Sequence, residues 1–166
     1  MHPTAIKNAH SFVYKYLRGS QGLRVLDVGG ANINGGLRGL FVSAGHSYTA
    51  LDIQEAQGVD IVAQQGEPFP IESSSFDAVV STSMIEHDPA FWLTFNEMVR
   101  VCSSGGYIYI NAPSSGPYHA HPIDCWRFLI DAFPALERWN GSVELVENYI
   151  DENSHWRDCV GVFKKH

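Results

Sequence analysis

Hydrophobic residues gather along the chain in short, dense runs that turn-forming residues separate. Short apolar runs bounded by such residues are typical of strands that are buried on both faces. They predict five strands, at residues 24–29, 47–53, 59–64, 76–87 and 105–113.

Between these runs the hydrophobic residues follow helical spacing. This spacing predicts an N-terminal helix at about residues 4–18 and helices at 35–45, 89–102 and 124–139, the last interrupted at Pro134. Strands that alternate with helices indicate a parallel sheet covered on both faces.

The two C-terminal runs, at residues 142–150 and 157–165, have no helix between them. We therefore expect them to pair as an antiparallel hairpin. Together the patterns predict a single α/β domain over residues 1–166, a Rossmann-like three-layer sandwich. Its sheet would have seven strands, mostly parallel, with the antiparallel hairpin at the C-terminal end.

The formal net charge of -7 and the lack of a basic run argue against nucleic-acid or anionic-lipid partners, which need clustered Lys and Arg. No apolar run approaches the roughly 20 residues of a membrane-spanning helix, and no apolar leader is visible. Cys102, Cys125 and Cys159 lie far apart, without paired spacing. We expect a reduced, cytoplasmic protein that does not contact a membrane.

The first predicted strand runs into a loop rich in glycine and asparagine, GGANINGG, at residues 29–36. Glycine tolerates positive φ angles, and a turn of this composition leaves backbone N–H groups exposed. The loop is therefore expected to let a ligand approach the main chain closely.

Four landmarks, in order and spacing, resemble the class I S-adenosylmethionine-dependent methyltransferases, within a small type-11-like subgroup. They are a strand ending LDVGG, a second ending LDI, a fourth followed by STSMIEH, and a helix leading into GGYIYINAPS. The likeness runs from about Leu23 to Phe128, and the C-terminal hairpin also suits the family. The resemblance implies S-adenosyl-L-methionine as cofactor and transfer of its methyl group as the reaction.

The resemblance implies cofactor contacts at two strand ends. Asp27 and Gly29 would hold the amino-acid end of the cofactor, and Asp52 would accept both ribose hydroxyls, as an acid at this place does in dinucleotide folds. Ile53 would lie against adenine. A loop cap for Asp27 and a strand-end turn for Asp52 are the structural alternatives.

The glycine loop departs from the family's commonest pattern, because Ala31 and Ile33 occupy two glycine places. It resembles instead a subgroup with an Asn-x-Asn-Gly turn, represented here by Asn32, Asn34 and Gly35. Gly30, Asn32 and Asn34 are expected to contact the cofactor. Gly30 as a plain turn residue is the alternative.

Two further regions complete the predicted cofactor site. Gln64 and Gln65 stand where relatives often place an acid, and Gln65 is expected to hydrogen-bond adenine, with an exposed loop position as the alternative. Ser81, Thr82 and Met84 would border the reactive end of the cofactor, with core packing as the alternative for Met84.

The acceptor side is predicted in residues 114–128, which follow the fifth parallel strand and resemble a subgroup segment His-Pro-x-Asp-x-Trp-Arg-Phe. Histidine titrates near neutral pH and can take a proton from an acceptor. His121 or His119 is the candidate base, with His87 behind them. Arg127 is the candidate for clamping a carboxylate or phosphate of the acceptor.

Two other interpretations of this segment stay open. Arg127 can instead pair with Asp124 and fix the start of the predicted helix. A metal site is the sharper alternative, but the spacing matches no tight zinc pattern, so no metal is expected. Its possible ligands are His119, His121, Cys125 and His87.

The leading functional hypothesis is a methyltransferase acting on a small-molecule or glycan acceptor. A nicotinamide-dependent oxidoreductase is a weaker rival, because the first loop lacks the Gly-x-Gly-x-x-Gly order and the chain has no Tyr-x-x-x-Lys pair. A methyltransferase-like fold kept as a non-catalytic binding or scaffold subunit is the third candidate. A homo-oligomer or a partner chain would complete the acceptor pocket if the chain itself does not.

Overall fold

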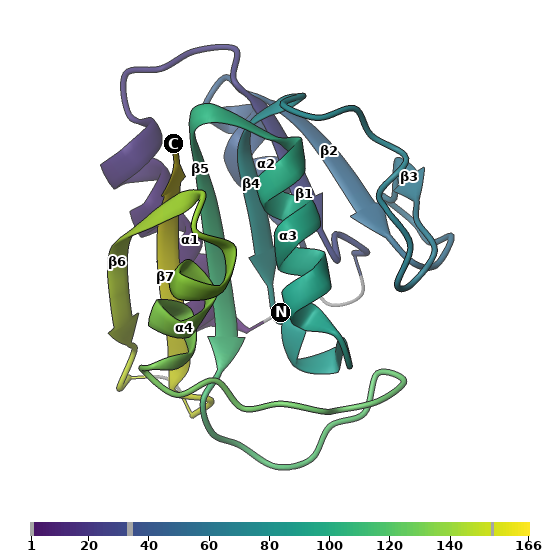
Figure 1. The fold of residues 1–166 in the computed structure, drawn as a ribbon, viewed down its shortest axis with the longest axis vertical. Coiled ribbons are helices and arrows are strands. Elements are labelled where there is room, and N and C mark those ends of the chain that lie inside the picture. Colours follow the sequence, from purple (N-terminus) through teal and green to yellow (C-terminus); the bar gives the residue numbers. More distant parts are fainter. Residues whose placement is uncertain (1, 33–34, 154) are drawn as a thin grey trace.

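The described residues form one mixed β-sheet with helices on both faces (Figure 1). This computed structural model describes residues 2–32, 35–153 and 155–166, so the predicted cofactor contact Asn34 lies outside the described residues. The seven strands found in these ranges are β1 (Arg24–Val28), β2 (Ser47–Asp52), β3 (Ile61–Val62), β4 (Phe76–Thr82), β5 (Cys102–Pro113), β6 (Val143–Ile150) and β7 (Asp158–Lys165).

The strands lie in the order β3-β2-β1-β4-β5-β7-β6. The first five are parallel, and β7 pairs antiparallel with both β5 and β6. The order turns back at β1 and β4, so their carboxyl ends flank the place where ligands bind in open α/β sheets. The predicted fold class, a Rossmann-like three-layer sandwich with a C-terminal antiparallel hairpin, is confirmed.

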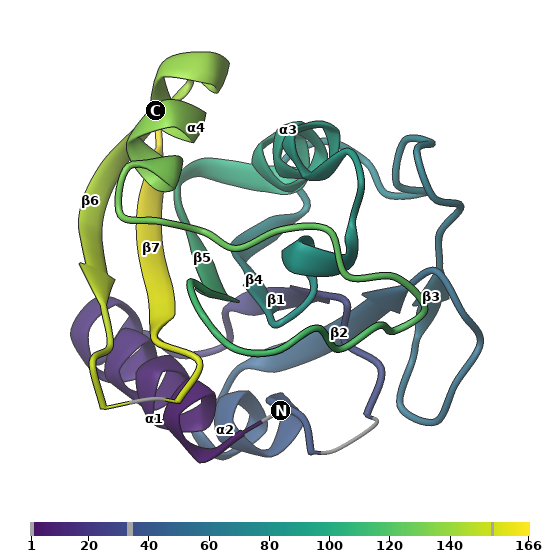
Figure 2. The same ribbon diagram turned by 90° about the horizontal axis from the view of Figure 1, so that it is seen from below.

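Figure 2 shows the three layers edge-on, with the sheet in the middle. One face carries α1 (Pro3–Phe12), which continues as a π-helical turn at Val13–Leu17, and α2 (Arg38–Ser43). The other face carries α3 (Phe91–Val101) and α4 (Ala132–Asn140).

Each face of the sheet has its own hydrophobic core. Phe12 of α1 and Phe41 of α2 pack with alternate residues of β1 and β4 such as Val25. On the opposite face, Phe95 of α3 and Phe133 of α4 pack with the other residues of the same strands. Because successive side chains of a strand point to opposite faces, strands buried on both sides must be apolar at nearly every position, as the sequence pattern indicated.

The predicted helix at residues 124–139 is wrong in its first half, because α4 begins only at Ala132. The backbone N–H groups of Cys125 and Trp126 donate to the carbonyl of Glu86, and that of Phe128 donates to the carbonyl of Pro113. These long-range bonds take the place of helical ones. Pro134 lies in the first turn of α4, where its missing N–H costs nothing.

Two predicted strands are shorter than expected. The run at residues 59–64 contributes only Ile61–Val62, at the edge of the sheet. The run at 76–87 leaves the sheet after Thr82, and Ile85–His87 form a 3-10 turn.

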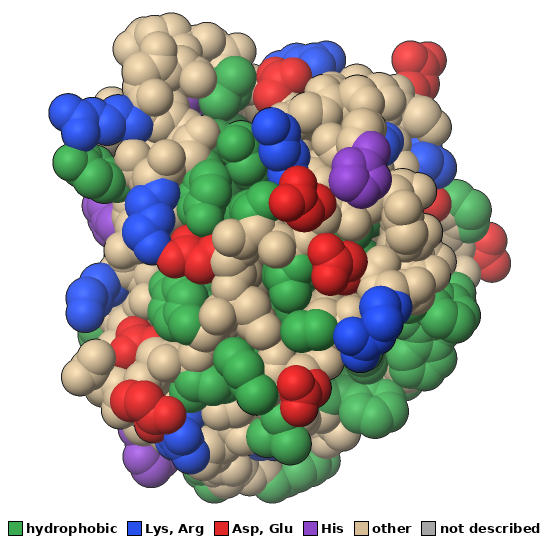
Figure 3. Space-filling model, turned by 60° about the vertical axis from the view of Figure 1, so that its left-hand side comes forward, with side chains coloured by type: hydrophobic (Ala, Val, Ile, Leu, Met, Phe, Trp, Pro, Cys, Tyr) green, Lys and Arg blue, Asp and Glu red, His purple; other side chains and the backbone are tan. Residues whose placement is uncertain are grey.

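One face of the molecule carries charges of both signs. On the face shown in Figure 3, acidic and basic side chains of the described residues are interspersed with hydrophobic ones. In the described part of the chain, no helix has the length and apolar character needed to cross a membrane.

Two glycine substitutions should affect stability with opposite signs. A Cβ atom on Gly161 of β7 would lie 2.6 Å from the ring of the fully buried Phe133. Gly161→Ala should therefore lower the free energy of unfolding by about 1 to 3 kcal/mol through overpacking. Gly39 in α2 has nothing described within 4 Å of such an atom, so Gly39→Ala should raise stability by up to about 1 kcal/mol.

Urea denaturation of the two variants and the parent measures both effects. Equal stability of Gly161→Ala and the parent would contradict the packing of α4 on β7.

Candidate active site

A cavity of about 880 Å³ opens at the carboxyl ends of the parallel strands. It lies at the upper end of the range, roughly 300–1,000 Å³, in which proteins bind small ligands. Its wall includes eight of the residues predicted for the site: Gly29, Asp52, Ile53, Gln65, Met84, His87, His119 and His121.

The glycine loop does not offer its first backbone amides to a ligand. The N–H groups of Gly29 and Gly30 both donate to the carbonyl of Leu51, at 2.8 and 3.0 Å. Asn32 donates its N–H to the Gln57 carbonyl, at 3.4 Å. The expectation of exposed N–H groups is therefore wrong at these three positions, because the amides tie the end of β1 to β2 and the segment after it.

Asp52 stands at the end of β2, on the wall of the cavity. Its two carboxylate oxygens accept backbone N–H groups from Ala31, at 3.2 Å, and from Gln54, at 3.2 Å. These bonds hold the side chain between two loops. Because a carboxylate has about four acceptor sites, two remain for hydroxyl donors in the cavity.

Asp27 lies beside the cavity and does not line it. Its side chain is buried and accepts a hydrogen bond from the hydroxyl of Tyr48. Burial raises the pKa of Asp27 to about 6, although the Tyr48 hydroxyl lowers it in part; Asp52 raises it further and Arg38 opposes this. A buried carboxylate of this kind costs stability at neutral pH.

Gly29 is needed for a close contact inside the protein. Its φ is +82°, and a Cβ there would lie 2.3 Å from Cγ of Met84 and 2.5 Å from its Cβ. Met84 is half-buried, packs against the core and also lines the cavity, so both roles considered for it are present. A larger residue at position 29 would displace Met84 before it met a ligand.

The remaining predicted cofactor residues differ in access to the cavity. Ile53 and Gln65 are exposed on its wall. Ser81 is fully buried and donates to the carbonyl of Val28 at 2.9 Å, which joins β4 to β1. Gly30 packs on Ala50, outside the cavity.

A long loop, residues 114–131, crosses below the strand ends and closes one side of the cavity (Figure 1). It is anchored by the backbone bonds from Cys125 and Trp126 to the Glu86 carbonyl, and the indole of Trp126 donates to the Asp88 carbonyl at 2.9 Å. The loop therefore holds His119 and His121 on the cavity wall at the strand ends.

Asp124 and Arg127 form a bidentate pair within this loop, with distances of 2.6 Å (Oδ1 to Nη1) and 2.8 Å (Oδ2 to Nη2). Hydrogen bonds from Arg127 hold the pKa of Asp124 well below its ordinary value, with a further contribution from the backbone N–H of His119. Arg127 does not line the cavity. Of the two interpretations of Arg127, the geometry supports the ion pair, which braces the loop.

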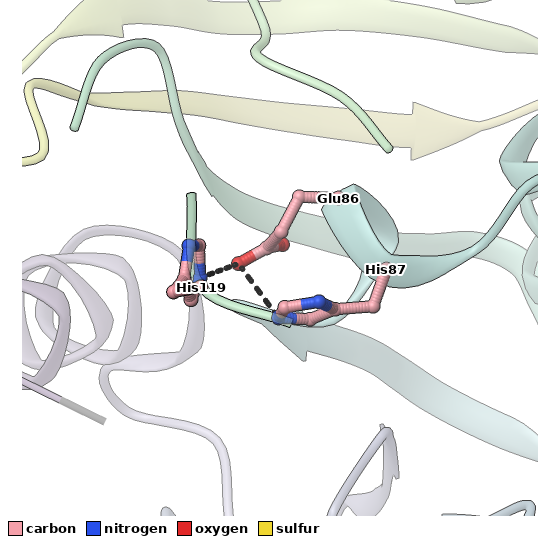
Figure 4. A group of neighbouring side chains, drawn as sticks. All are labelled: Glu86, His87 and His119. Atoms are coloured by element: carbon pink, nitrogen blue, oxygen red, sulfur yellow. Dashed lines mark ion pairs between the residues drawn. The ribbon is translucent and has the colours of Figure 1, made fainter. Parts of the chain in front are cut away.

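Glu86 and two histidines converge on the cavity wall (Figure 4). Oε1 of Glu86 lies 3.7 Å from Nε2 of His87 and 3.9 Å from Nε2 of His119. Burial raises the pKa of Glu86 to about 8, an effect that its own backbone amide partly offsets. Burial also lowers the pKa of His87.

His121 lies on the cavity wall as an exposed side chain, with its ring centroid 6.4 Å from that of His87. The structure thus brings three of the four predicted catalytic residues, His87, His119 and His121, to one part of the cavity.

Glu86 was not among the predicted site residues, although it belongs to the STSMIEH segment. An acid directly before a histidine, just after a strand of a parallel sheet, was the available signal. Thr82, which was expected beside Ser81 and Met84, lines the cavity, and its buried hydroxyl has no hydrogen-bond partner among the described residues.

Comparisons with known proteins agree with this arrangement. A sequence model of the methyltransferase-domain family matches residues 26–110, which run from within β1 to within β5. An uncharacterised methyltransferase of Mycobacterium sp. (strain JLS) is 29% identical over 118 residues, which are 65% of this chain and 46% of that protein. The chain therefore spans about half the length of this relative.

Two solved structures share the fold. The 1,6-didemethyltoxoflavin-N1-methyltransferase of Burkholderia thailandensis, with bound 1,6-didemethyltoxoflavin and S-adenosylhomocysteine, has a TM-score of 0.77 at 18% identity, covering 97% of this chain and 78% of that one. An S-adenosylmethionine-dependent methyltransferase from Mesorhizobium loti has a TM-score of 0.72 at 13% identity, covering 97% and 98%.

The fold is that of a class I methyltransferase domain. Since the family match covers half of its length, the chain belongs to the methyltransferase-domain family, whose cofactor is S-adenosylmethionine.

The raised pKa of Asp27 predicts a pH-dependent stability. Because this pKa is higher in the folded chain, at about 6, than its ordinary value of 3.8, ionisation of Asp27 opposes folding. The cost is absent below about pH 4 and fully present above about pH 6, where it amounts to about 3 kcal/mol. Asp27→Asn should therefore stabilise the protein by this order at pH 7.5, and by much less at pH 4.

Asp77→Asn is the matched control for denaturation at both pH values. Hydrogen bonds from Arg24 lower the pKa of Asp77, so this carboxylate stabilises the fold above its ordinary pKa, and its loss should destabilise at pH 7.5. An Asp27→Asn variant that is no more stable than the parent at pH 7.5 would show that Asp27 is not held at an energetic cost.

Proposed function

We propose that this chain binds S-adenosylmethionine in the cavity at the strand ends and transfers the methyl group to a small-molecule or glycan acceptor held under the 114–131 loop. The proposal rests on one observation, that the predicted cofactor residues and the histidine cluster line two different sides of one cavity. Asp52 lies at one side, on β2, and the Glu86 and histidine cluster lies at the other, beyond β4, with Met84 on the wall of the same cavity.

The cofactor side of the cavity matches the parts of S-adenosylmethionine. The ribose diol would use the two unoccupied acceptor sites of Asp52, whose orientation Ala31 and Gln54 already fix. Ile53, 44% exposed without a ligand, would cover adenine, and Gln65 would hydrogen-bond its edge. Gly29 and the loop after it would take the amino-acid end, with Asp27 behind them.

On the acceptor side we assign the general base to His121. The Nδ1 atoms of His87 and His119 contact oxygen atoms of the loop, whereas no described residue holds the His121 imidazole by a hydrogen bond. The acceptor oxygen or nitrogen would attack the methyl carbon while its proton passes to His121. The carbon–sulfur bond breaks with its electron pair left on sulfur, which yields S-adenosylhomocysteine.

A small acceptor is favoured by the cavity and by the charge. Ile123 and Trp156 give its acceptor side apolar walls against which a ring can lie. The net charge of -7 opposes binding to a polyanion. Arg127 takes a positioning role, since Asp124 occupies its guanidinium.

Replacing Asp52 should weaken binding of S-adenosylhomocysteine. Asp52→Ala removes two charged hydrogen bonds, which corresponds to roughly 2 to 4 kcal/mol, or about 30- to 1000-fold in affinity. Calorimetry measures this, with Glu55→Ala as the control, because Glu55 is an exposed carboxylate three residues away and outside the cavity. Equal affinities of the parent and Asp52→Ala would remove Asp52 from the site.

Replacing His121 should separate chemistry from cofactor binding. Incubation of the protein with methyl-labelled cofactor and a metabolite extract identifies an acceptor by its label. With that acceptor, His121→Ala should lower turnover by about 100- to 10,000-fold while cofactor affinity stays within about threefold. Undiminished turnover would exclude His121 as the base, and saturable cofactor binding without labelled product would favour a non-catalytic subunit.

A further inference from the structure

Glu86 is a fully buried acid whose carboxylate accepts no hydrogen bond from any other residue that the structure describes. Burying a carboxylate in this way costs several kcal/mol unless a donor or a cation satisfies it. The carboxylate faces the cavity wall, so the missing partner can come from a ligand.

The hydrogen bonds of His87 fix which of its nitrogens is free. Its Nδ1 lies 2.6 Å from the carbonyl oxygen of Ile123. A carbonyl oxygen only accepts, so Nδ1 carries the hydrogen and Nε2 of the neutral ring presents a lone pair. That lone pair lies on the side of Glu86.

His119 is fixed in the same way. Its Nδ1 lies 3.2 Å from Oδ2 of Asp124. Nη2 of Arg127 is also 3.3 Å from Nδ1, but its two hydrogens are directed to the carbonyl of Pro117, at 2.7 Å, and to Asp124, at 2.8 Å. Nδ1 also lies 3.3 Å from the carbonyl oxygen of Pro117, which only accepts. Nδ1 therefore carries the hydrogen, and Nε2 is again the free acceptor.

When Glu86 is ionised, three acceptors point at one another without a hydrogen between them (Figure 4). The two Nε2 atoms are 3.7 and 3.9 Å from Oε1 of Glu86, beyond hydrogen-bond distance, and all three atoms lie within 4.8 Å of one another. Around a tetrahedral Zn²⁺ ion, with bonds of about 2.0 to 2.2 Å, such atoms stand roughly 3.3 Å apart. Side-chain shifts of about 1 Å or less would close the site.

We infer that Glu86, His87 and His119 form a binding site for a divalent transition-metal ion, with Zn²⁺ as the ion that fits best. Two imidazoles and one carboxylate are a ligand set of catalytic zinc sites, which keep a further position open. The Ile123 carbonyl and Asp124 supply the outer contacts that such histidines require. This inference replaces the expectation that the cluster holds no metal, because only the fold brings His119 of the loop to the buried Glu86.

The open coordination position would face the cavity and take an oxygen or nitrogen atom of the methyl acceptor. A bound cation lowers the pKa of such a group and fixes its place. This consequence rests on the proposed function, whereas binding of the ion does not depend on methyl transfer.

The test is a titration of untagged, chelator-treated protein with Zn²⁺, and with Co²⁺ for its visible spectrum, in the absence of cofactor. The parent should bind one ion and melt at a higher temperature when it is bound. Glu86→Gln and His119→Ala should lose this binding, and Asp124→Asn should weaken it by about 10- to 100-fold. His10→Ala, which removes an exposed histidine of α1, should bind as the parent does.

Melting without metal separates loss of the site from loss of the fold. Glu86→Gln removes an unpartnered buried charge, so in chelator it should melt no lower than the parent. Absence of saturable binding by the parent, or equal binding by Glu86→Gln and the parent, would overturn the inference. Metal binding without methyl transfer would support the metal site and count against the proposed function. Methyl transfer by a protein that binds no metal would support the proposed function and overturn the metal site.

Discussion

The backbone carbonyl of Glu86 accepts two hydrogen bonds from the loop that follows β5, and much of the site depends on this attachment. The bonds come from Cys125 and Trp126, and they replace the first turns of a helix that the sequence favours there. They hold the loop across the carboxyl ends of the strands. The side chain of the same residue faces His87, in the same turn, and His119, in the loop. One short turn after β4 therefore both anchors the loop and contacts one of its histidines.

A second attachment, at the other side of the cavity, fixes the cofactor end. The amides of Gly29 and Gly30 donate to Leu51, and the amides of Ala31 and Gln54 donate to Asp52. Asp52 is thus oriented before any ligand arrives, which lowers the entropic cost of binding. The buried Asp27 beside it is ionised at a cost in folding free energy. Such a cost is common where a residue is required for function and not for stability.

The sequence could predict the fold because the information is local. Strands buried on both faces must be apolar, and the order of strands, helices and glycine turns determines a parallel sheet with an antiparallel end. Asp52 could be placed at the cavity for the same reason, since the end of β2 follows from the pattern. Helix α4 was misplaced because the bonds that unwind residues 124–131 run to Glu86 and Pro113, far away in the chain.

The acceptor side could be predicted only in part. The histidines were recognised from their residue type, but the role of Glu86 depends on its burial and on His119, which reaches it from a distant loop. The tautomers of His87 and His119 depend on Ile123 and Asp124, and no spacing rule indicates those contacts. For Arg127 the sequence left two roles open, because a guanidinium can clamp an anionic ligand or pair with a nearby carboxylate. The structure supports the pair with Asp124.

A crystal structure of the protein with S-adenosylhomocysteine would test most directly whether the two sides of the cavity are assigned correctly. The account predicts both ribose hydroxyls within hydrogen-bond distance of Asp52 and the sulfur directed toward the part of the cavity that holds Glu86, His119 and His121. A nucleoside bound away from Asp52, or a sulfur directed away from the histidines, would contradict it.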